Sequence, residues 1–282
     1  MAITKVSDLN SLYNSIYEDA IFVAREQNIM TNLVKNYSAT GWMNRVIPQY
    51  AQVTAQSVNE GVDFANPTTF SKTPLATLTP GEVMAQVLLT DRDVETDPDD
   101  ARQSAATELG NAIATKIDTD LVGLFSGFSS GKGSAGNSLT IAKCAAAISK
   151  LRTNKVMNPI YVVLHPYGWH DVWVELGQPA ANQAFLGDLA NEALKAFFVG
   201  QMLAAQWFTS ANISIDGSDD AIGAAFNRGA LGFDSRKAPY LETERDASRR
   251  STELNMVAGY AYGEVRDDHG IKLTHDATEP TG

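Results

Sequence analysis

The fold is decided by residues 41–80, which read GWMNRVIPQYAQVTAQSVNEGVDFANPTTFSKTPLATLTP. Glutamine, asparagine and threonine replace apolar periodicity in this stretch, and proline and glycine interrupt it. Short alternation around residues 50–55 and 75–78, with a turn near residues 60–63, predicts a two-stranded ribbon. Its threonines and aromatic residues also favour strand over disorder. A mobile surface loop is the alternative, although loops beyond about 15 residues without structure of their own are uncommon.

Such a ribbon has too few large apolar side chains to support itself. An isolated two-stranded hairpin is only marginally stable in water, so it needs a surface on which to pack. We expect that surface to belong to a neighbouring copy of the chain. The stretch therefore favours a structural protein that assembles with copies of itself over an enzyme.

A long helix is predicted downstream of the ribbon. Residues 82–90 alternate loosely and predict a strand that returns to a core. Asp97-Pro98-Asp99-Asp100 then has the pattern of a helix start, with Asp97 as the cap and Pro98 in the first turn. Apolar residues follow at helical spacing as far as Ser126-Gly127. We expect this helix to form the spine of the fold.

The remaining segments mix helices and strands without strict alternation, so the predicted fold class is α+β. Ser7 and Asp8 open an amphipathic helix that continues to residue 25. A glycine- and serine-rich break covers residues 127–136. The other expected elements are helices at 138–153, 166–176 and 190–201 and strands at 160–164, 207–215 and 221–226.

The end of the chain predicts a β-hairpin. Residues 254–263 alternate between apolar and small or polar side chains. Asp267-Asp268-His269-Gly270 has turn composition, and Ile271 and Leu273 resume the alternation after it. We therefore expect the two last strands to pair with each other.

Composition limits the class of protein. The 282 residues are 44% hydrophobic and 20% charged, which suits one large core or two smaller ones. The net charge is −11 and the sequence pI is about 4.8. Such an acidic chain gains no affinity from counterion release at a phosphate backbone, which argues against a reader of duplex DNA. Enclosing nucleic acid without gripping it is compatible with this charge.

The sequence points to a soluble protein made in a reducing cytoplasm. The single cysteine, Cys144, cannot form an intrachain disulfide and lies in an alanine-rich run typical of a buried helix position. No signal-peptide pattern follows Met1. No apolar run approaches the roughly 20 residues that cross a bilayer, so we expect no membrane partner.

Residues 131–136, GKGSAG, match the dinucleotide pattern G-x-G-x-x-G, but their context does not fit. That pattern needs a preceding strand and an acidic residue about 20 positions later. Here a helix precedes it, and no Asp or Glu occurs between Leu121 and His170. The spacing and residue types of a phosphate loop are also missing. We expect a linker; a nucleotide-binding enzyme is the alternative, and this glycine pattern is its only support.

No other pattern predicts chemistry. His165 and His170 are five positions apart with Pro166 between them, whereas a metal-binding pair on a helix prefers a spacing of four. The chain has no G-x-S-x-G nucleophile elbow. Adjacent acids such as Asp219-Asp220 lie at predicted caps and turns, where carboxylates are solvated. We therefore predict no catalytic residue, no metal site and no cofactor.

The acid-free stretch between Leu121 and His170 carries an excess of positive charge. Such an excess suits phosphate groups or an acidic neighbour, although a solvated helix face is its commoner origin. The basic residues are Lys132, Lys143, Lys150, Arg152 and Lys155.

Taken in order, these segments resemble the major capsid proteins of tailed bacteriophages, which share the HK-ninety-seven fold. The ribbon resembles the family's E-loop, here about residues 44–79, and the helix that begins at Asp97 resembles its spine helix. Residues 161–172, YVVLHPYGWHDV, are similar to the strand, proline turn and Trp-His helix of the axial domain. Further similar runs are LKAFFVG at 194–200, TSAN at 209–212 and ERDASRR at 244–250.

The resemblance implies a domain organisation. It places an N-terminal arm at 1–43 and the E-loop at 44–80. A peripheral domain with the long spine helix would consist of 81–136 and 246–282, and an axial domain would cover 137–245. Chains with this organisation form hexamers and pentamers of an icosahedral shell around double-stranded DNA.

The resemblance also implies partners and a location. The chain would assemble in the host bacterial cytoplasm and become part of the virion. Its partners would be other copies of itself, a portal at one vertex, a decoration protein and packaged DNA without sequence-specific contact. Because the chain begins at Met1 almost directly with its arm, we expect a separate scaffolding protein. The nearest alternative is an encapsulin-type shell, which shares the fold but encloses a protein cargo.

Some members of this family cross-link an E-loop lysine to a peripheral-domain asparagine with the help of a glutamate. Lys72 and Asn255 are residues of the matching types. The strand from Met256 to Gly263 lacks an interior glutamate, however, and Glu253 and Glu264 are not placed by the pattern. We therefore predict no cross-link.

Two groups of residues are predicted to contact neighbouring copies. The first group lies on the E-loop and consists of Tyr50, Asp63, Phe64, Phe70 and Lys72. The second group precedes the last strands, where we expect intersubunit salt bridges from Asp246, Arg249 and Arg250. An ordinary exposed charge cluster is the alternative for the second group.

Overall fold

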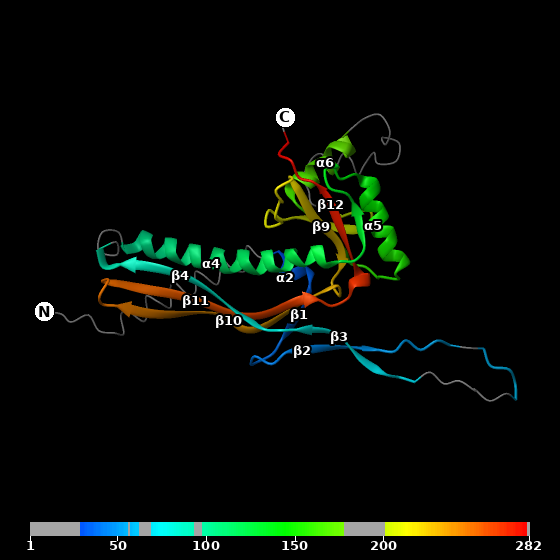
Figure 1. Cartoon of the computed structure of the whole chain (residues 1–282), viewed down its shortest axis with the longest axis horizontal. Helices are drawn as coiled ribbons and strands as arrows, with labels where there is room; N and C mark the ends of the chain where they lie inside the picture. The colour runs from blue at the N-terminus through cyan, green and yellow to red at the C-terminus, as the bar shows by residue number, and fades with distance from the viewer. Residues whose placement is uncertain (1–28, 56, 62–68, 93–97, 178–200, 281–282) are drawn as a thin grey trace.

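The computed structural model describes residues 29–55, 57–61, 69–92, 98–177 and 201–280. The helix predicted at 7–25 and all but the last residue of the helix predicted at 190–201 therefore lie outside the described residues, as does Asp97. The chain is elongated: a long helix lies along a four-stranded sheet, a six-stranded sheet stands at one end, and a two-stranded ribbon projects separately (Figure 1). The helices are α2 (Met30–Leu33), α4 (Pro98–Gly123), α5 (Ile141–Thr153) and α6 (Pro166–Gly177), with 3-10 turns η1 (Leu124–Gly127) and η2 (Asp267–His269).

The described strands form three sheets. The four-stranded sheet has the order β1-β10-β11-β4, the six-stranded sheet has the order β5-β12-β9-β6-β8-β7, and β2 pairs with β3. The strands are β1 (Lys35–Ser38), β2 (Arg45–Tyr50), β3 (Lys72–Leu78), β4 (Gly81–Thr90), β5 (Gly131–Gly133), β6 (Ile160–Leu164), β7 (Gln201–Met202), β8 (Ala205–Thr209), β9 (Asp220–Asn227), β10 (Leu231–Asp246), β11 (Ser251–Glu264) and β12 (Gly270–Asp276).

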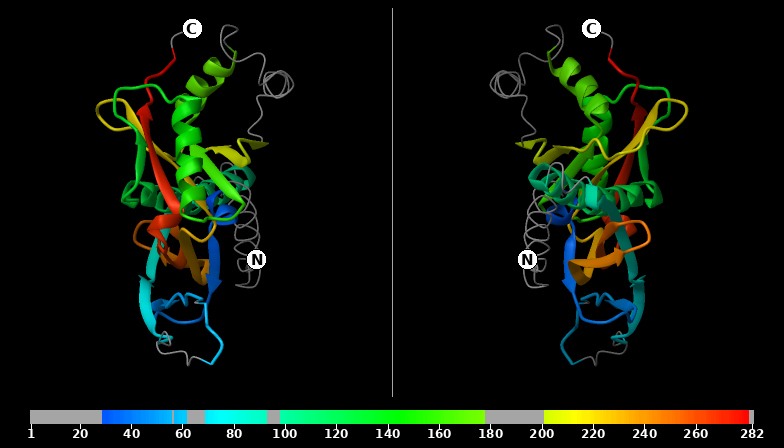
Figure 2. Two further views of the ribbon diagram at one scale, coloured as in Figure 1. Left: turned by 90° about the vertical axis from the view of Figure 1, so that its right-hand side faces the viewer. Right: turned by 90° about the vertical axis from the view of Figure 1, so that its left-hand side faces the viewer.

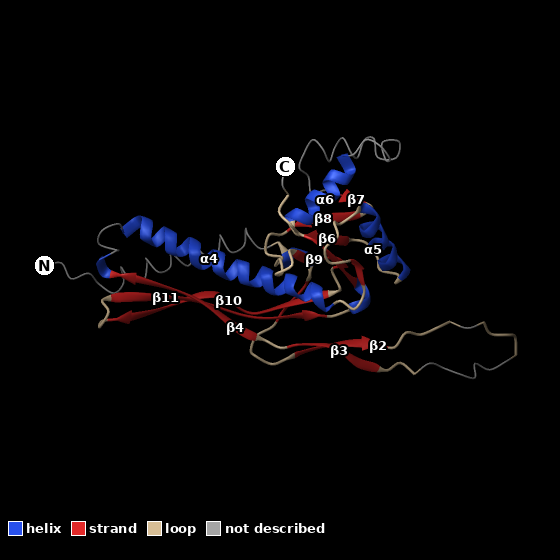
Figure 3. Cartoon of the chain, turned by 45° about the horizontal axis from the view of Figure 1, so that its top comes forward, coloured by secondary structure: helices blue, strands red, loops and turns tan. Residues whose placement is uncertain are grey.

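Helix α4 is the predicted spine, and its length follows from its sequence. Pro98 occupies the first turn, where its missing amide costs no hydrogen bond. Apolar residues then recur every four positions and pack on alternate residues of β4 and β11. Figure 3 shows the helix lying along these strands. The buried or half-buried helix residues in this core are Ala105, Leu109, Ile113 and Ile117.

The six-stranded sheet separates two apolar cores. On one face α5 and α6 pack against β6, β8 and β12, with Trp169 and Trp207 in contact. On the other face α2 and the C-terminal end of α4 pack against β6 and β9, around Phe125 and Phe226. Because β6 is covered on both sides, all five of its residues are buried, as its unbroken apolar run predicts.

The ribbon of β2 and β3 confirms the predicted two-stranded element, but its first strand begins earlier than expected. We predicted alternation at residues 50–55, whereas β2 ends at Tyr50. Pro48 lies inside β2 at a register shift between Ile47 and Pro48. A two-stranded ribbon has only edge strands, and edge strands tolerate proline at such irregularities.

The predicted C-terminal hairpin is wrong. Strand β11 pairs with β10 and β4, whereas β12 pairs with β9 and β5 in the other sheet. The turn at 267–270 thus carries the chain from one sheet to the other instead of folding it back on itself. Two other details differ: the glycine-rich break contains β5, and Gln201, predicted to end a helix, begins β7.

Each of the two larger sheets contains strands from both the predicted peripheral and the predicted axial range, and these domain ranges stay a prediction. Strand β10, which falls almost entirely in the range 137–245, belongs with β11 and β4. Strand β12, in the range 246–282, belongs with β9 and β6, and β5 lies at the edge of that sheet. The end-on views in Figure 2 separate the upper six-stranded part from the lower four-stranded part and the ribbon.

Candidate assembly surface

The ribbon is held to the rest of the chain at its base. Leu78, the last residue of β3, is buried and contacts the glycines at positions 232 and 263. A Cβ atom at Gly263 would lie 2.8 Å from the Leu78 Cδ2 atom, so a larger residue there would displace the leucine. Glycines in β10 and β11 thus make the recess that receives the ribbon's apolar anchor.

A buried carboxylate forms the second attachment. Asp234 in β10 is fully buried, and its Oδ2 atom lies 2.7 Å from Arg45 Nε of β2 and 2.6 Å from Arg236 Nη2. Arg45 also donates to the Ser38 carbonyl at 3.0 Å, and Arg236 donates to the Gly41 carbonyl at 3.2 Å. These two guanidinium groups therefore fix both the start of the ribbon and the segment that leads into it.

Beyond its base, the ribbon exposes apolar side chains that nothing in its own chain covers among the described residues. Tyr50 and Phe70 stack with ring centroids 5.3 Å apart, yet they are 53% and 66% exposed. Val53 and Val58 are similarly exposed. In Figure 1 the ribbon projects to the right, past the end of the four-stranded sheet. Such a surface is typical of a segment that packs on another molecule.

The outer face of the four-stranded sheet exposes apolar side chains of β4. On β4, Val83 and its alternate neighbours face α4, whereas Met84 and Leu88 point to the opposite side and are exposed. Strand pairing places Met84 beside Val257 of β11 and Val257 beside Tyr240 of β10. An apolar row therefore crosses the outer face of this sheet, and it is exposed at Met84 and buried at Val257.

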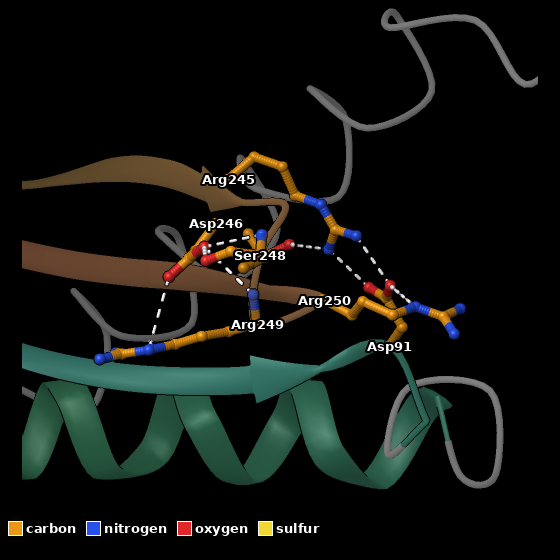
Figure 4. A network of polar contacts seen from close by, with 7 residues as sticks. Asp91, Arg245, Asp246, Ser248, Arg249 and Arg250 are labelled. Carbon is orange, nitrogen blue, oxygen red and sulfur yellow. Dashed lines mark hydrogen bonds and ion pairs between the residues drawn. The ribbon is translucent and has the colours of Figure 1, made fainter.

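Charged side chains gather at the distal turn between β10 and β11 (Figure 4). Arg245 donates to both carboxylate oxygens of Asp91, at 2.5 and 2.7 Å, and Arg250 Nε lies 3.7 Å from Asp91 Oδ2. The hydrogen bonds from Arg245 hold the pKa of the Asp91 carboxyl below its ordinary value. The pair joins the end of β4 to this turn.

Asp246 accepts hydrogen bonds within the same turn. Its Oδ1 atom accepts hydrogen bonds from the Ser248 side chain at 2.6 Å and from the amides of Ser248 and Arg249. These bonds lower the pKa of the Asp246 carboxyl. Arg249 Nε lies 3.6 Å from Asp246 Oδ2. The cluster predicted to bridge subunits thus has partners in its own chain, while Arg249 and Arg250 remain largely exposed.

The predicted contact residues fall into two separate places. Lys72 pairs in register with Tyr50 on the ribbon, so these two residues and Phe70 lie together. Asp63 and Phe64 lie outside the described residues. Asp246, Arg249 and Arg250 lie at the distal turn, away from the ribbon. Asn255 lies in β11 with Glu253 two positions earlier on the same face, and the prediction of no cross-link stays a prediction.

Sequence reasoning missed the residues that hold the ribbon. Asp234 and Arg236 lie in β10, a strand that was not predicted, and Arg45 was not singled out. The only local signal for this attachment is the lone aspartate between Phe233 and Ser235. Acidic side chains are seldom buried without a cationic partner, so a buried aspartate here would imply one.

The residues considered for chemistry have structural surroundings. Cys144 is buried in α5, and burial raises the pKa of its thiol to about 12, so it is not reactive. His165 Nδ1 accepts from the Tyr167 amide at 3.2 Å and lies at the start of α6. Within the described part of the chain, no group of three or more His, Cys, Asp or Glu could hold a metal ion. No described helix is long and apolar enough to cross a membrane.

Comparison with known proteins gives a consistent result. A family model described as phage capsid protein matches residues 85–273. No curated protein matches the sequence significantly.

Solved structures of low sequence identity share the fold. The capsid of cyanophage P-SCSP1u is 14% identical over 89% of each chain, with a TM-score of 0.68. A structure of Mycobacterium phage Che8 is 20% identical over 87% of this chain and 90% of that chain, with a TM-score of 0.64. A virus-like particle from Pyrococcus furiosus is 10% identical over 93% and 98%, with a TM-score of 0.57.

Proposed function

The chain belongs to the family of phage capsid proteins, and from this premise we propose that it assembles into the hexamers and pentamers of an icosahedral head that encloses double-stranded DNA. The matches confirm the predicted resemblance and the α+β HK-ninety-seven fold. The observation that carries the proposal is the ribbon, because its exposed Tyr50, Val53 and Phe70 have no cover among the described residues of their own chain.

We assign the domains from the sheets. In this proposal the peripheral domain consists of α4 and the four-stranded sheet, so it includes β10. The axial domain consists of the six-stranded sheet with α5 and α6, so it includes β5 and β12. The E-loop is the ribbon with its connecting residues, and residues 1–43 form the N-terminal arm.

The mechanism is assembly through repeated burial of modest surfaces. The ribbon of one copy lies on the α4 and four-stranded-sheet unit of the next, where Met84 and Leu88 offer exposed apolar side chains. Burying one large apolar side chain contributes about 1.5–3 kcal/mol. Each contact can stay weak, because a closed shell engages many of them at once.

The further partners follow from the same proposal. They are a separate scaffolding protein, a portal at one vertex, a decoration protein and DNA held without sequence-specific contact. The net charge of −11 supports loose enclosure over tight gripping of the DNA. Assembly takes place in the host bacterial cytoplasm, and the role is structural, not catalytic.

Deletion of the ribbon tests the proposal. Replacing residues 52–75 with a short Gly-Ser turn keeps Arg45 and Leu78, which anchor the base. The shortened chain should unfold cooperatively near the wild-type temperature but form no closed shells by electron microscopy. Loss of folding would mean that the ribbon packs within its own chain, and closed shells from the shortened chain would refute the proposal.

The likeness to the virus-like particle from Pyrococcus furiosus supports a second candidate, an encapsulin-type shell with a protein cargo. Both candidates require the same shell contacts, so the molecules enclosed in the shell decide between them. Small uniform cages that lack nucleic acid absorbance and retain a protein cargo would favour the encapsulin-type shell. Particles that protect DNA from nuclease would favour the phage head.

A further inference from the structure

Five basic side chains remain without a carboxylate partner. Among the described residues, Lys132, Lys143, Lys150, Arg152 and Lys155 form no ion pair. Four of them are exposed, and Lys143 is half-buried with its Nζ atom donating to the Ser138 carbonyl at 2.9 Å. They fall between Leu121 and His170, a stretch that contains no Asp or Glu, in a chain with a net charge of −11.

These cations surround one helix on one face of the six-stranded sheet. Helix α5 packs on the sheet through Cys144, Ala147, Ile148 and Leu151. Lys143 and Lys150 are seven positions apart, so they lie on the same side of the helix, about 10 Å from each other. The exposed residues between these lysines are small, so another molecule can approach closely; they are Ala146 and Ser149.

Lys132 extends this surface to the edge of the sheet. It pairs in register with Leu273 of β12, whose side chain belongs to the core beneath α5, so Lys132 points to the same side. Glu175 of α6 accepts a hydrogen bond from the Ile141 amide at 2.7 Å and thereby caps the start of α5. We call the surface formed by these five cations the α5 face.

The opposite face of the same sheet is acidic. The loop of residues 210–219 packs there through Ile213, in the core shared with the end of α4. Asp216 and Asp219 of this loop are exposed and form no ion pair among the described residues. Asp276 is adjacent, because the Ala277 amide donates to the Asp219 carbonyl at 2.6 Å. Opposite faces of one sheet therefore carry opposite charge.

A hollow lies between this loop and the last turns of α4. Its volume is about 180 Å³, and its lining includes Thr119, Ser126, Ser214, Asp216 and Asp220. The C-terminal end of a helix carries partial negative charge, and the last turn of α4, DLVG, contains no basic residue. One lysine lies near this end, because Lys272 Nζ donates to the Ser126 carbonyl at 3.5 Å. The helix end and the two aspartates together make this acidic hollow a site that attracts a cation.

We propose that the α5 face of one copy packs against the acidic hollow of the next copy, with Lys143 and Lys150 directed at Asp216 and the end of α4. The inference rests on the proposed shell function and names one of its contacts. Two different patches on opposite faces make a head-to-tail contact, and such contacts close into rings when the rotation between copies allows it. This ring would be the capsomer.

The placement of the elements supports a neighbouring copy of the chain as the molecule that packs against the acidic hollow. In Figure 1 α5 lies on the side toward which the ribbon projects, so both would reach the same neighbour. The loop of residues 210–219 (yellow) lies on the other side of the sheet. Copies that each carry a net charge of −11 repel one another, and a local pairing of opposite patches offsets that repulsion and sets the orientation.

Charge reversal and charge exchange test the proposal in the full chain. Lys143→Glu with Lys150→Glu should raise the lowest protein concentration at which capsomers or shells sediment roughly tenfold. Lys143→Arg with Lys150→Arg keeps the charge and is the matched control. Ser214→Lys places a cation at the hollow without removing a hydrogen bond among the described residues, and it should weaken assembly likewise. Combining Ser214→Lys with the two glutamates should restore it.

The outcomes are distinct. Unchanged thermal unfolding with impaired assembly and restoration by the combined variant supports the contact. Assembly of the glutamate variant at the wild-type concentration overturns it, including the case in which its shells form normally but retain less DNA, because the α5 face would then meet nucleic acid. Failure of the wild-type chain to assemble at all would instead refute the proposed shell function.

Discussion

Asp234 of β10 and Arg45 of β2 are 189 positions apart in the sequence, yet Arg45 Nε lies 2.7 Å from Asp234 Oδ2. This pair and Arg236 join the four-stranded sheet to the start of the ribbon. The ribbon's direction therefore depends on a fully buried carboxylate, whereas its outer part depends on whatever it packs against.

Removal of the Asp234 carboxylate should destabilise the chain strongly. Asp234→Ala leaves Arg236, whose side chain is 5% exposed, without its ionic partner. Breaking such a buried pair costs about 3–5 kcal/mol. Urea denaturation should show this loss for Asp234→Ala, and a much smaller loss for Asp91→Ala, which breaks an exposed pair. Equal losses from the two variants would contradict the buried anchor.

The stacked pair on the ribbon should matter for assembly and not for folding. Tyr50→Ser with Phe70→Ser removes two exposed rings, so the unfolding temperature should change little. Assembly should require a protein concentration that is more than about tenfold higher, since each lost ring removes about 2 kcal/mol of burial at a contact and about 1.4 kcal/mol corresponds to a factor of ten. Sedimentation measures this, with Thr54→Ser and Thr69→Ser as the control. Assembly as in the wild type would show that the stack stays in solvent.

His275 should make stability depend on pH. The ring is fully buried in β12, its Nδ1 donates to the Leu273 carbonyl at 3.0 Å, and its Nε2 has no partner among the described residues. Burial lowers the pKa of His275 below 6.5, against the opposing charges of Asp171, Asp220 and Asp276. His165 is also close, and its pKa is lowered by its own burial and by the charge of His275.

The direction in which stability changes with pH follows from proton uptake by His275. Between the lowered pKa of the folded chain and the unfolded value of 6.5, only the unfolded chain binds the proton, so stability falls as the pH drops below about 6.5. Urea midpoints at pH 7.5 and pH 5 should differ more for the wild type than for His275→Gln. His170→Gln, at a half-exposed position, is the control. The same pH dependence in all three chains would exclude His275 as its source.

Charge reversal at the distal turn tests the predicted intersubunit salt bridges. Arg249→Glu with Arg250→Glu breaks two exposed intrachain pairs with distances of 3.6 and 3.7 Å, so stability should change by less than about 1 kcal/mol. If these arginines also bridge subunits, shell assembly should fall while the fold persists. Assembly unaffected by the reversal would leave them as an ordinary exposed cluster.

Local patterns were sufficient for elements whose own residues carry the signal. The spine helix, β6 and β4 follow from apolar periodicity, and Pro98 marks the helix start. The ribbon could be inferred because its composition excludes an internal core. Its strand limits could not, since alternation in an exposed ribbon does not distinguish paired residues from extended ones.

Local patterns could not predict the pairing of strands that are far apart in the sequence. Strand β10 has register shifts between Ser235 and Lys237 and between Lys237 and Tyr240, and these irregularities break the two-residue alternation that predicts a strand. The turn at 267–270 has hairpin composition, but β12 finds its partners in β9 and β5. The acidic hollow combines residues more than 90 positions apart, so no local pattern could reveal it.

Electron microscopy of the purified full-length chain, after size-exclusion chromatography, tests the central claim most directly. The account predicts closed shells or ring-shaped capsomers, with the ribbon of each copy lying on its neighbour. A protein that stays strictly monomeric at high concentration, with or without a co-expressed scaffolding protein, would contradict it.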